Sequence, residues 1–188
     1  MPRIVDHDEM RKRLLDVAGE RFAARGYAAT GMRDLAAAAG VSTGSLYHYF
    51  PDKRTLFEQL VEQTVDADLA DLEEALGALP PAAPARLEAF LRLVRDHEDT
   101  LQLQSAVLVE YARLARSEAS GSLAPSRAAH RRYATALARL LGVSRERAEL
   151  VLHAVTGLLL QRFTDGGATP FAPLERELRA LCAREEAP

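Results

Sequence analysis

Glycine and proline gather at a few boundaries along this chain, and that distribution restricts its fold more than any other feature. The segments between the boundaries are long enough for helices, and none shows the sustained alternation of apolar and polar residues that a half-buried strand requires. Apolar residues recur instead at spacings of three and four, as on one face of a helix. The sequence therefore predicts an all-α chain of about nine helices.

The expected helices share apolar residues at helical spacing and a capping or breaking residue near each end. Gly26 and Gly40 are expected to end the first and second helices in the left-handed conformation that glycine tolerates. Thr30 is expected to cap the second helix, and Ser42 or Thr43 the third. The helices are expected at residues 8–25, 30–39, 43–49, 53–77, 84–96, 101–117, 125–141, 144–164 and 170–184.

Composition and the first residues bear on the compartment in which the chain functions. The chain has 188 residues, of which 48% are hydrophobic and 27% charged, enough for a core in one domain or two small ones. No run approaches the roughly 20 apolar residues of a membrane span, and the N-terminus is charged where a secretory signal would be apolar. The single cysteine, Cys182, excludes an internal disulfide. We therefore expect a cytoplasmic protein with no membrane partner.

The net charge of -3 is unevenly distributed along the chain. Up to Arg54 the chain carries nine Lys and Arg against seven Asp and Glu, whereas the remainder carries fifteen against twenty. This difference in sign predicts that the two parts face different partners. The acidic residues of the fourth expected helix are interpreted as a solvated face; they are Glu58, Glu62, Asp66, Asp68, Asp71, Glu73 and Glu74.

Residues 30–53 contain two short expected helices joined by a tight turn, which is the arrangement of a helix-turn-helix. Gly40 supplies the positive φ that the turn needs. Leu46 and Phe50, four residues apart, are expected to face the core, which directs the intervening polar side chains outward. A short exposed helix that carries hydroxyls, a glycine and aromatic side chains is suited to a DNA groove.

The same segment resembles the TetR family of bacterial repressors. The residues that carry the resemblance are 22–27 (FAARGY), Thr30, Leu35, Ala36, 39–42 (AGVS), Gly44, Leu46, Tyr47, Tyr49, Phe50 and Lys53. The resemblance implies a homodimer whose N-terminal helix-turn-helix reads palindromic operator DNA. It also implies a divergent C-terminal bundle that binds a small-molecule inducer. On this basis we expect a DNA-binding domain at residues 1–52 and a ligand-binding and dimerisation domain at residues 53–188.

Individual DNA contacts are carried over from the family only where residues match. Thr43, Gly44 and Ser45 match base-reading and backbone-approach positions, and Lys53 matches a phosphate-contacting lysine. Thr43 departs from the lysine or arginine of many members. The full set of expected DNA-binding residues is Thr30, Arg33, Ser42, Thr43, Gly44, Ser45, Tyr47, His48, Tyr49 and Lys53.

Two further sites are expected in the C-terminal part. A mainly apolar ligand is expected among Phe90, Val94, Val107, Glu110, Tyr111 and His153. Helices 125–141 and 144–164 carry more apolar surface than one subunit is expected to hide, and small residues there permit close helix approach, so a second copy should cover them. The expected dimer interface consists of Tyr133, Leu137, Leu140, Val151, Ala154, Gly157 and Leu158.

The sequence leaves two alternatives to an inducible regulator. One is a DNA-binding regulator without a small-molecule inducer, which a filled C-terminal core would favour. The other is a helical enzyme or binding protein that does not use its motif. No catalytic constellation, phosphate loop or metal-ligand spacing is evident in the sequence, so we expect neither an enzyme, a cofactor nor a metal site.

Overall fold

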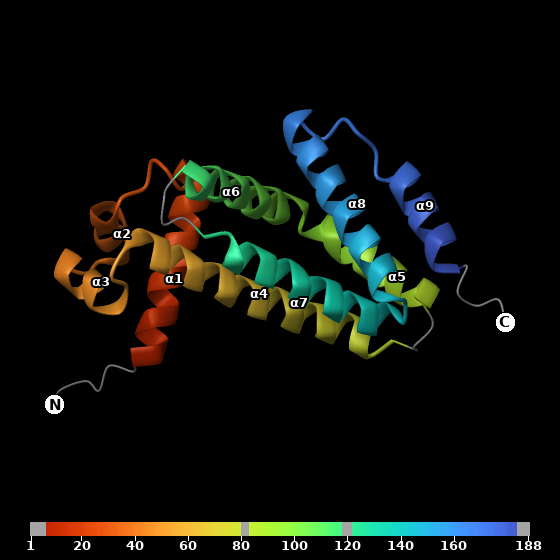
Figure 1. Cartoon of the computed structure of the whole chain (residues 1–188), viewed down its shortest axis with the longest axis horizontal. Coiled ribbons are helices and arrows are strands. Elements are labelled where there is room, and N and C mark those ends of the chain that lie inside the picture. Colours follow the sequence, from red (N-terminus) through yellow and green to blue (C-terminus); the bar gives the residue numbers. More distant parts are fainter. Residues whose placement is uncertain (1–6, 80–82, 118–121, 184–188) are drawn as a thin grey trace. The chain divides into compact units, whose positions relative to one another are not determined.

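The computed structural model describes residues 7–79, 83–117 and 122–183, and within these ranges every regular element is a helix. The expected all-α fold is therefore confirmed (Figure 1). The nine helices of the described ranges are α1 (His7–Arg25), α2 (Met32–Ala39), α3 (Thr43–Tyr49), α4 (Lys53–Gly77), α5 (Ala83–Asp96), α6 (Glu98–Ser117), α7 (Ala124–Leu141), α8 (Arg145–Thr164) and α9 (Ala172–Ala183).

The chain divides into two compact units that are not continuous in sequence. The first comprises Met1–Thr64 and Val107–Ser126, and the second comprises Val65–Ala106 and Arg127–Pro188. Helices α4 and α6 each contribute residues to both units. The expected boundary between residues 52 and 53 divides the chain by function, into DNA binding and ligand binding, and not by packing. It therefore stays a prediction.

Aromatic side chains fill the core of the first unit. The rings of Phe57 and Tyr111 stack with centroids 4.6 Å apart, and Tyr27 lies edge-on to both at 5.0 and 5.4 Å. Phe22 adds a further edge contact with Phe57 at 5.6 Å. Such pairs stabilise a core beyond the burial of their area. The second part of α6 is thereby packed with the helix-turn-helix in one unit.

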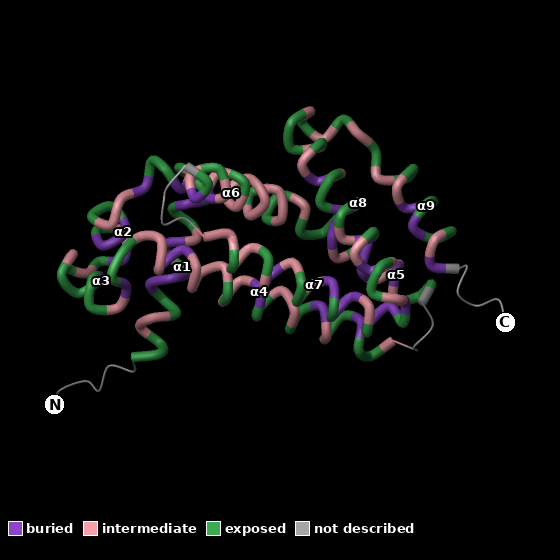
Figure 2. Tube along the Cα trace, viewed as in Figure 1, coloured by how far each residue is buried: buried purple, intermediate pink, exposed green. Residues whose placement is uncertain are grey.

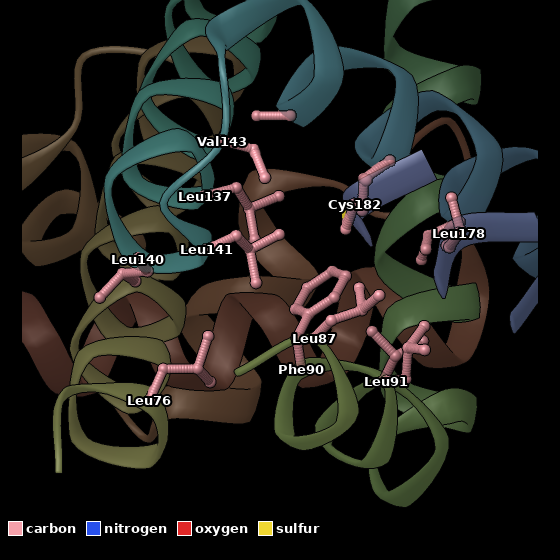
Figure 3. Close-up of a cluster of buried hydrophobic side chains, with 14 of the residues drawn as sticks. Leu76, Leu87, Phe90, Leu91, Leu137, Leu140, Leu141, Val143, Leu178 and Cys182 are labelled. Carbon is pink, nitrogen blue, oxygen red and sulfur yellow. The ribbon is translucent and has the colours of Figure 1, made fainter. Parts of the chain in front are cut away.

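The second unit has a separate core in which aliphatic side chains predominate. Figure 3 shows side chains of α5, α7 and α9 converging there, among them Phe90, Leu141 and Cys182. These three side chains are at most 7% exposed. In the same unit, Arg162 of α8 forms a bidentate ion pair with Glu98, the first residue of α6, with nitrogen–oxygen distances of 2.6 and 3.1 Å. Within the described residues no helix is long and apolar enough to cross a membrane.

Candidate nucleic-acid interface

The turn between α2 and α3 is closed by backbone hydrogen bonds and one side-chain cap. Gly40 has a φ of +68° and its N–H donates to the Ala37 carbonyl at 3.2 Å. Ser42 then caps α3, because its hydroxyl accepts the Ser45 N–H at 3.0 Å. The expected left-handed glycine and the expected serine cap are both confirmed. Because Ser42 is engaged as a cap, its oxygen is committed to the helix start.

Helix α3 presents one buried face and one open face, as the spacing of its residues predicted. Leu46 and Phe50 are 1% and 0% exposed, whereas Tyr47 retains 49% of its surface. Gly44, Ser45 and His48 are also exposed, and Thr43 and Tyr49 are half-buried (Figure 2). A Cβ at Gly44 would meet only the Ser42 oxygen, at 3.8 Å. The expected contact residues on α3 therefore form a surface that a groove can approach.

Lysine 53 lies at the start of α4, where the preceding residue caps the helix. Asp52 accepts the Thr55 N–H at 2.7 Å, and this hydrogen bond lowers the pKa of the Asp52 carboxyl. The Lys53 ammonium donates to the Tyr27 carbonyl at 2.9 Å and lies 4.3 Å from the Tyr27 ring centroid. Its position is thus set by the turn that follows α1. The phosphate contact expected of Lys53 stays a prediction.

The structure corrects the role expected of Thr30. Its side chain is 1% exposed, and its hydroxyl donates to the Gly26 carbonyl at 2.8 Å. Helix α2 is preceded instead by Gly31, whose N–H donates to the Asp34 carboxylate at 3.1 Å. Thr30 therefore neither caps α2 nor offers a side chain to DNA. Arg33, in the first turn of α2, is exposed.

Sequence reasoning missed two residues of α1 that reach the end of α3. Tyr49 places its hydroxyl 3.2 Å from Nδ1 of His7. Arg11 donates to the Tyr49 carbonyl at 3.3 Å and to the Gln59 side chain at 2.8 Å. These contacts join residues about forty positions apart, so no local spacing in the sequence signals them.

A surface hollow of about 270 Å³ lies between α1 and α2 of the first unit. Arg21 and Arg25 line it from α1, and Asp34 lines it from α2. A second hollow, of about 330 Å³, is lined by residues 95–100. Neither hollow is lined by any of the six expected ligand residues. Among the described residues no cluster of three or more His, Cys, Asp and Glu side chains could hold a metal ion.

Two of the expected ligand residues use their polar groups within the first unit. Glu110 of α6 accepts the backbone N–H groups of Tyr27 and Ala28 at 2.8 and 2.9 Å. Tyr111 is 2% exposed and donates its hydroxyl to Glu58 at 2.9 Å. Burial raises the pKa of Tyr111, and the hydrogen bond to Glu58 raises it further. Both groups stabilise the fold of the unit that contains the helix-turn-helix.

The other expected ligand residues differ in exposure. Phe90 and Val94 are 7% and 4% exposed in the core of the second unit. Val107 is half-buried against the core of the first unit. His153 was expected to lie in an apolar environment, but it is exposed and stacks on His130 with ring centroids 4.9 Å apart. The ligand contact expected of His153 stays a prediction.

Three of the seven residues expected at the dimer interface are buried by their own chain. Leu137, Leu140 and Val151 are 1%, 2% and 0% exposed, because the aliphatic core of the second unit surrounds them. Tyr133 donates its hydroxyl to Asp68 of α4 at 2.5 Å. Leu137, Leu140 and Val151 therefore offer almost no surface to a partner, and Tyr133 is half-buried.

The solvent-facing side of α8 keeps the remaining three positions. Gly157 is exposed, and a Cβ placed there would meet nothing within 4 Å. Ala154 and Leu158 are half-buried beside it. Leu150 and Phe163, which the sequence interpretation did not include, retain 54% and 46% of their surface.

The acidic residues of α4 are not all solvated. Asp68 lies against Tyr133, and burial raises the pKa of the Asp68 carboxyl above its usual value although the hydrogen bond opposes the shift. Glu58 accepts the Tyr111 hydroxyl. The expectation of a uniformly solvated face is therefore wrong at these two positions, where a tyrosine from another helix supplies a partner.

The turn, the buried support and the open face of α3 together define a helix-turn-helix DNA-binding fold. A family model described as bacterial regulatory proteins of the tetR family matches residues 14–60. The HTH-type transcriptional repressor KstR2 of Rhodococcus jostii is 45% identical over 81 residues, which cover 43% of this chain and 39% of that protein. Residues 14–60 thus match the N-terminal domain of the TetR family, and the chain is similar to TetR-family regulators.

Solved structures extend the likeness beyond the matched segment. A transcriptional regulator from Rhodococcus has a TM-score of 0.72 and 27% identity, and the match covers 93% of this chain and 94% of that one. The regulator FadR of Bacillus subtilis, solved in complex with stearoyl-CoA, has a TM-score of 0.68 and 15% identity, covering 91% and 96%. The chain spans less than half the length of the curated relative KstR2.

Proposed function

We propose that this chain is a transcriptional regulator, and more specifically a repressor, that binds palindromic operator DNA as a homodimer and is released by a small-molecule inducer. The observation that carries the proposal is the open face of α3, which is held by a core on its other side. Base edges specify a sequence, while cationic and hydroxyl groups hold the backbone. Thr43, Gly44 and Ser45 would face bases, and Lys53 and Tyr47 would contact phosphates.

A homodimer follows from the size of one recognition helix. Helix α3 has seven residues, which contact too few bases to select one site in a genome. Two copies related by a two-fold axis would read half-sites whose centres lie about 34 to 36 Å apart, or slightly more. The side of α8 that carries Leu150 and Gly157 is the surface we assign to the second copy, because it combines an exposed apolar side chain with an open glycine.

An inducer is supported by the likeness to FadR, whose structure contains stearoyl-CoA. For this chain we propose a mainly apolar ligand that binds the DNA-free conformation more tightly. Converting a 99:1 preference into its reverse requires about 5.5 kcal/mol of differential binding. Phe90 and Val94 are buried, so such a ligand would have to displace core side chains when it enters.

A second candidate is a regulator without an inducer, responsive to its own concentration or to a protein partner. The observation in its favour is that Glu110 and Tyr111 already form hydrogen bonds within the chain, Glu110 with the Tyr27 backbone and Tyr111 with the Glu58 side chain. A screen of apolar metabolites separates the candidates. Ligands that raise the melting temperature and release operator DNA support an inducer. If stabilising ligands never alter operator affinity, the regulator is not gated in this way.

DNA recognition is tested by recovering genomic fragments with the purified protein and measuring affinity for the recovered site. Lys53→Ala should weaken all sequences alike and lower the salt slope by about 1, whereas Thr43→Ala should change the ranking of single-base operator variants. Arg176→Ala on α9, which removes an exposed arginine outside the helix-turn-helix, is the matched control. An unchanged ranking for Thr43→Ala would show that Thr43 reads no base.

A further inference from the structure

One peptide group joins a carboxylate of α6 to the lysine at the start of α4. The carbonyl of Tyr27 accepts the Lys53 ammonium at 2.9 Å, and the N–H of Ala28, which belongs to the same peptide group, donates to Glu110 at 2.9 Å. The other carboxylate oxygen of Glu110 accepts the N–H of Tyr27 at 2.8 Å. All four residues belong to the first unit. A negative and a positive side chain therefore lie at opposite ends of one amide.

The hydrogen bonds at the two ends of this peptide group reinforce each other. A carboxylate that accepts an amide N–H polarises the amide and makes its carbonyl oxygen a stronger acceptor. The hydrogen bond from Lys53 is therefore stronger than one to an amide without an anionic partner. The Tyr27 ring adds a second attraction, because the Lys53 ammonium lies 4.3 Å from the ring centroid. The turn after α1 thus provides two contacts that hold the end of the Lys53 side chain.

Helix α6 in turn holds Tyr27 in place. The Tyr27 ring is 7% exposed and lies edge-on to Tyr111 of α6 at 5.4 Å and to Phe57 of α4 at 5.0 Å. Its carbonyl oxygen also accepts the N–H of Thr30 at 3.4 Å, which closes the turn. The half-buried Glu110 is the side chain that accepts both N–H groups of the turn, so its loss would leave the backbone there without those acceptors.

We propose that Glu110 is a positioning residue for DNA binding, which holds the Lys53 ammonium, through the turn after α1, where a phosphate of the DNA backbone meets it. The inference rests on the proposed function, which assigns the phosphate contact to Lys53. A flexible lysine side chain loses conformational freedom when a phosphate fixes it, and a lysine that the free protein already holds loses less. Glu110 itself does not touch the DNA and acts only through the turn.

The sign of the effect separates positioning from simple charge. A carboxylate repels the DNA backbone, so its removal would by itself strengthen DNA binding. Positioning predicts the opposite sign. Glu110→Ala should weaken operator binding by roughly 2- to 10-fold per recognition helix, which corresponds to the cost of ordering one long side chain. The matched control is Glu62→Ala, which removes an exposed carboxylate of α4 in the same unit and should not weaken binding.

The test is a double-mutant cycle in DNA affinity, with the palindromic duplex recovered by the wild-type protein. Affinity and its salt dependence are measured for the wild type, Glu110→Ala, Lys53→Ala and the double variant, under conditions in which circular dichroism shows each of them to be folded. If Glu110 acts through Lys53, Glu110→Ala should change neither quantity in the Lys53→Ala background. A merely structural role would weaken binding equally in both backgrounds. Glu110→Gln keeps one oxygen acceptor without the charge, so its affinity should lie between those of the wild type and Glu110→Ala, and it replaces Glu110→Ala in the cycle if that variant does not fold.

Three results would overturn the inference, and they differ in what else they imply. Equal weakening by the Glu110 variant in both backgrounds, or tighter binding by the single variant, removes the positioning role and leaves the proposed function intact. Wild-type affinity and salt slope in Lys53→Ala would show that Lys53 contacts no phosphate, so that Glu110 has nothing to position. Failure of the wild type to select any duplex contradicts the proposed function, and the inference falls with it.

Discussion

The contact between Gly26 and Glu110 yields a prediction that the structure makes quantitative. Gly26 has a φ of +81°, and a Cβ placed on it would lie 2.9 Å from one Glu110 carboxylate oxygen and 3.4 Å from the other. Gly40 has a similar φ of +68°, but a Cβ there would meet nothing within 4 Å. The two glycines therefore share one cost of substitution, and only Gly26 adds a second.

For Gly40→Ala the expected loss in the free energy of unfolding is the left-handed penalty alone, about 1 to 2 kcal/mol. Gly26→Ala adds the displacement of Glu110 from the N–H groups of Tyr27 and Ala28. Hydrogen bonds to a charged group contribute about 1.5 to 3 kcal/mol each, and the half-buried Glu110 takes the lower end of that range. With two such bonds, we therefore expect Gly26→Ala to cost about 4 to 5 kcal/mol.

The assay is urea unfolding followed by circular dichroism, at one protein concentration so that association is held constant. A double-mutant cycle with Glu110→Ala isolates the contact. In the Glu110→Ala background, Gly26→Ala should cost no more than Gly40→Ala. Equal losses for Gly26→Ala and Gly40→Ala in the wild-type background would show that the Glu110 contact carries no energy, and the reasoning would be refuted.

Three further predictions concern association, induction and pH. Gly157→Arg should abolish the dimer without unfolding the chain, because the space around Gly157 is open. Gly77→Arg, at an equally open glycine, is the control. If light scattering shows that the Gly157→Arg protein is still a dimer, the assignment of α8 to the interface is wrong. Tyr111→Phe removes the hydrogen bond to Glu58, and if Tyr111 also contacts an inducer it should raise the inducer concentration needed for DNA release by more than it weakens operator binding without inducer. Equal effects on the two would assign Tyr111 to the fold alone. Asp68→Asn should stabilise the chain most at high pH, because burial raises the pKa of Asp68 and disfavours only the ionised carboxylate. The free energy of unfolding is measured at several pH values, and a gain in stability that does not shrink as the pH falls would refute this prediction.

Local signals in the sequence determined the helices and the face of α3. Capping by Ser42 and the left-handed conformation of Gly26 and Gly40 depend on atoms within a few residues, so sequence reasoning predicted all three. The inward orientation of Leu46 and Phe50 follows from helical spacing alone. These residues, together with the dense match at residues 22–53, were enough to indicate the family.

Thr30 shows where local chemistry leaves a choice open. A threonine hydroxyl can accept a hydrogen bond from the helix that follows or donate one to the turn that precedes it, and both options are compatible with the same sequence. In the structure the Thr30 hydroxyl donates to the Gly26 carbonyl in the preceding turn, and the Thr30 side chain is buried. Burial by the surrounding core decided the role.

Contacts between distant residues were decided by the tertiary structure alone. Periodicity shows that Leu137 and Val151 face an apolar environment, but it does not show whether their own chain or a second copy provides it; the aliphatic core of the second unit does. In the same way, the sequence does not reveal the partner of the Glu110 carboxylate, which accepts the N–H of Tyr27, 83 residues away in sequence. The physical reason is that helix formation depends on neighbours a few residues apart, whereas burial and the partners of charged groups depend on which helices pack together.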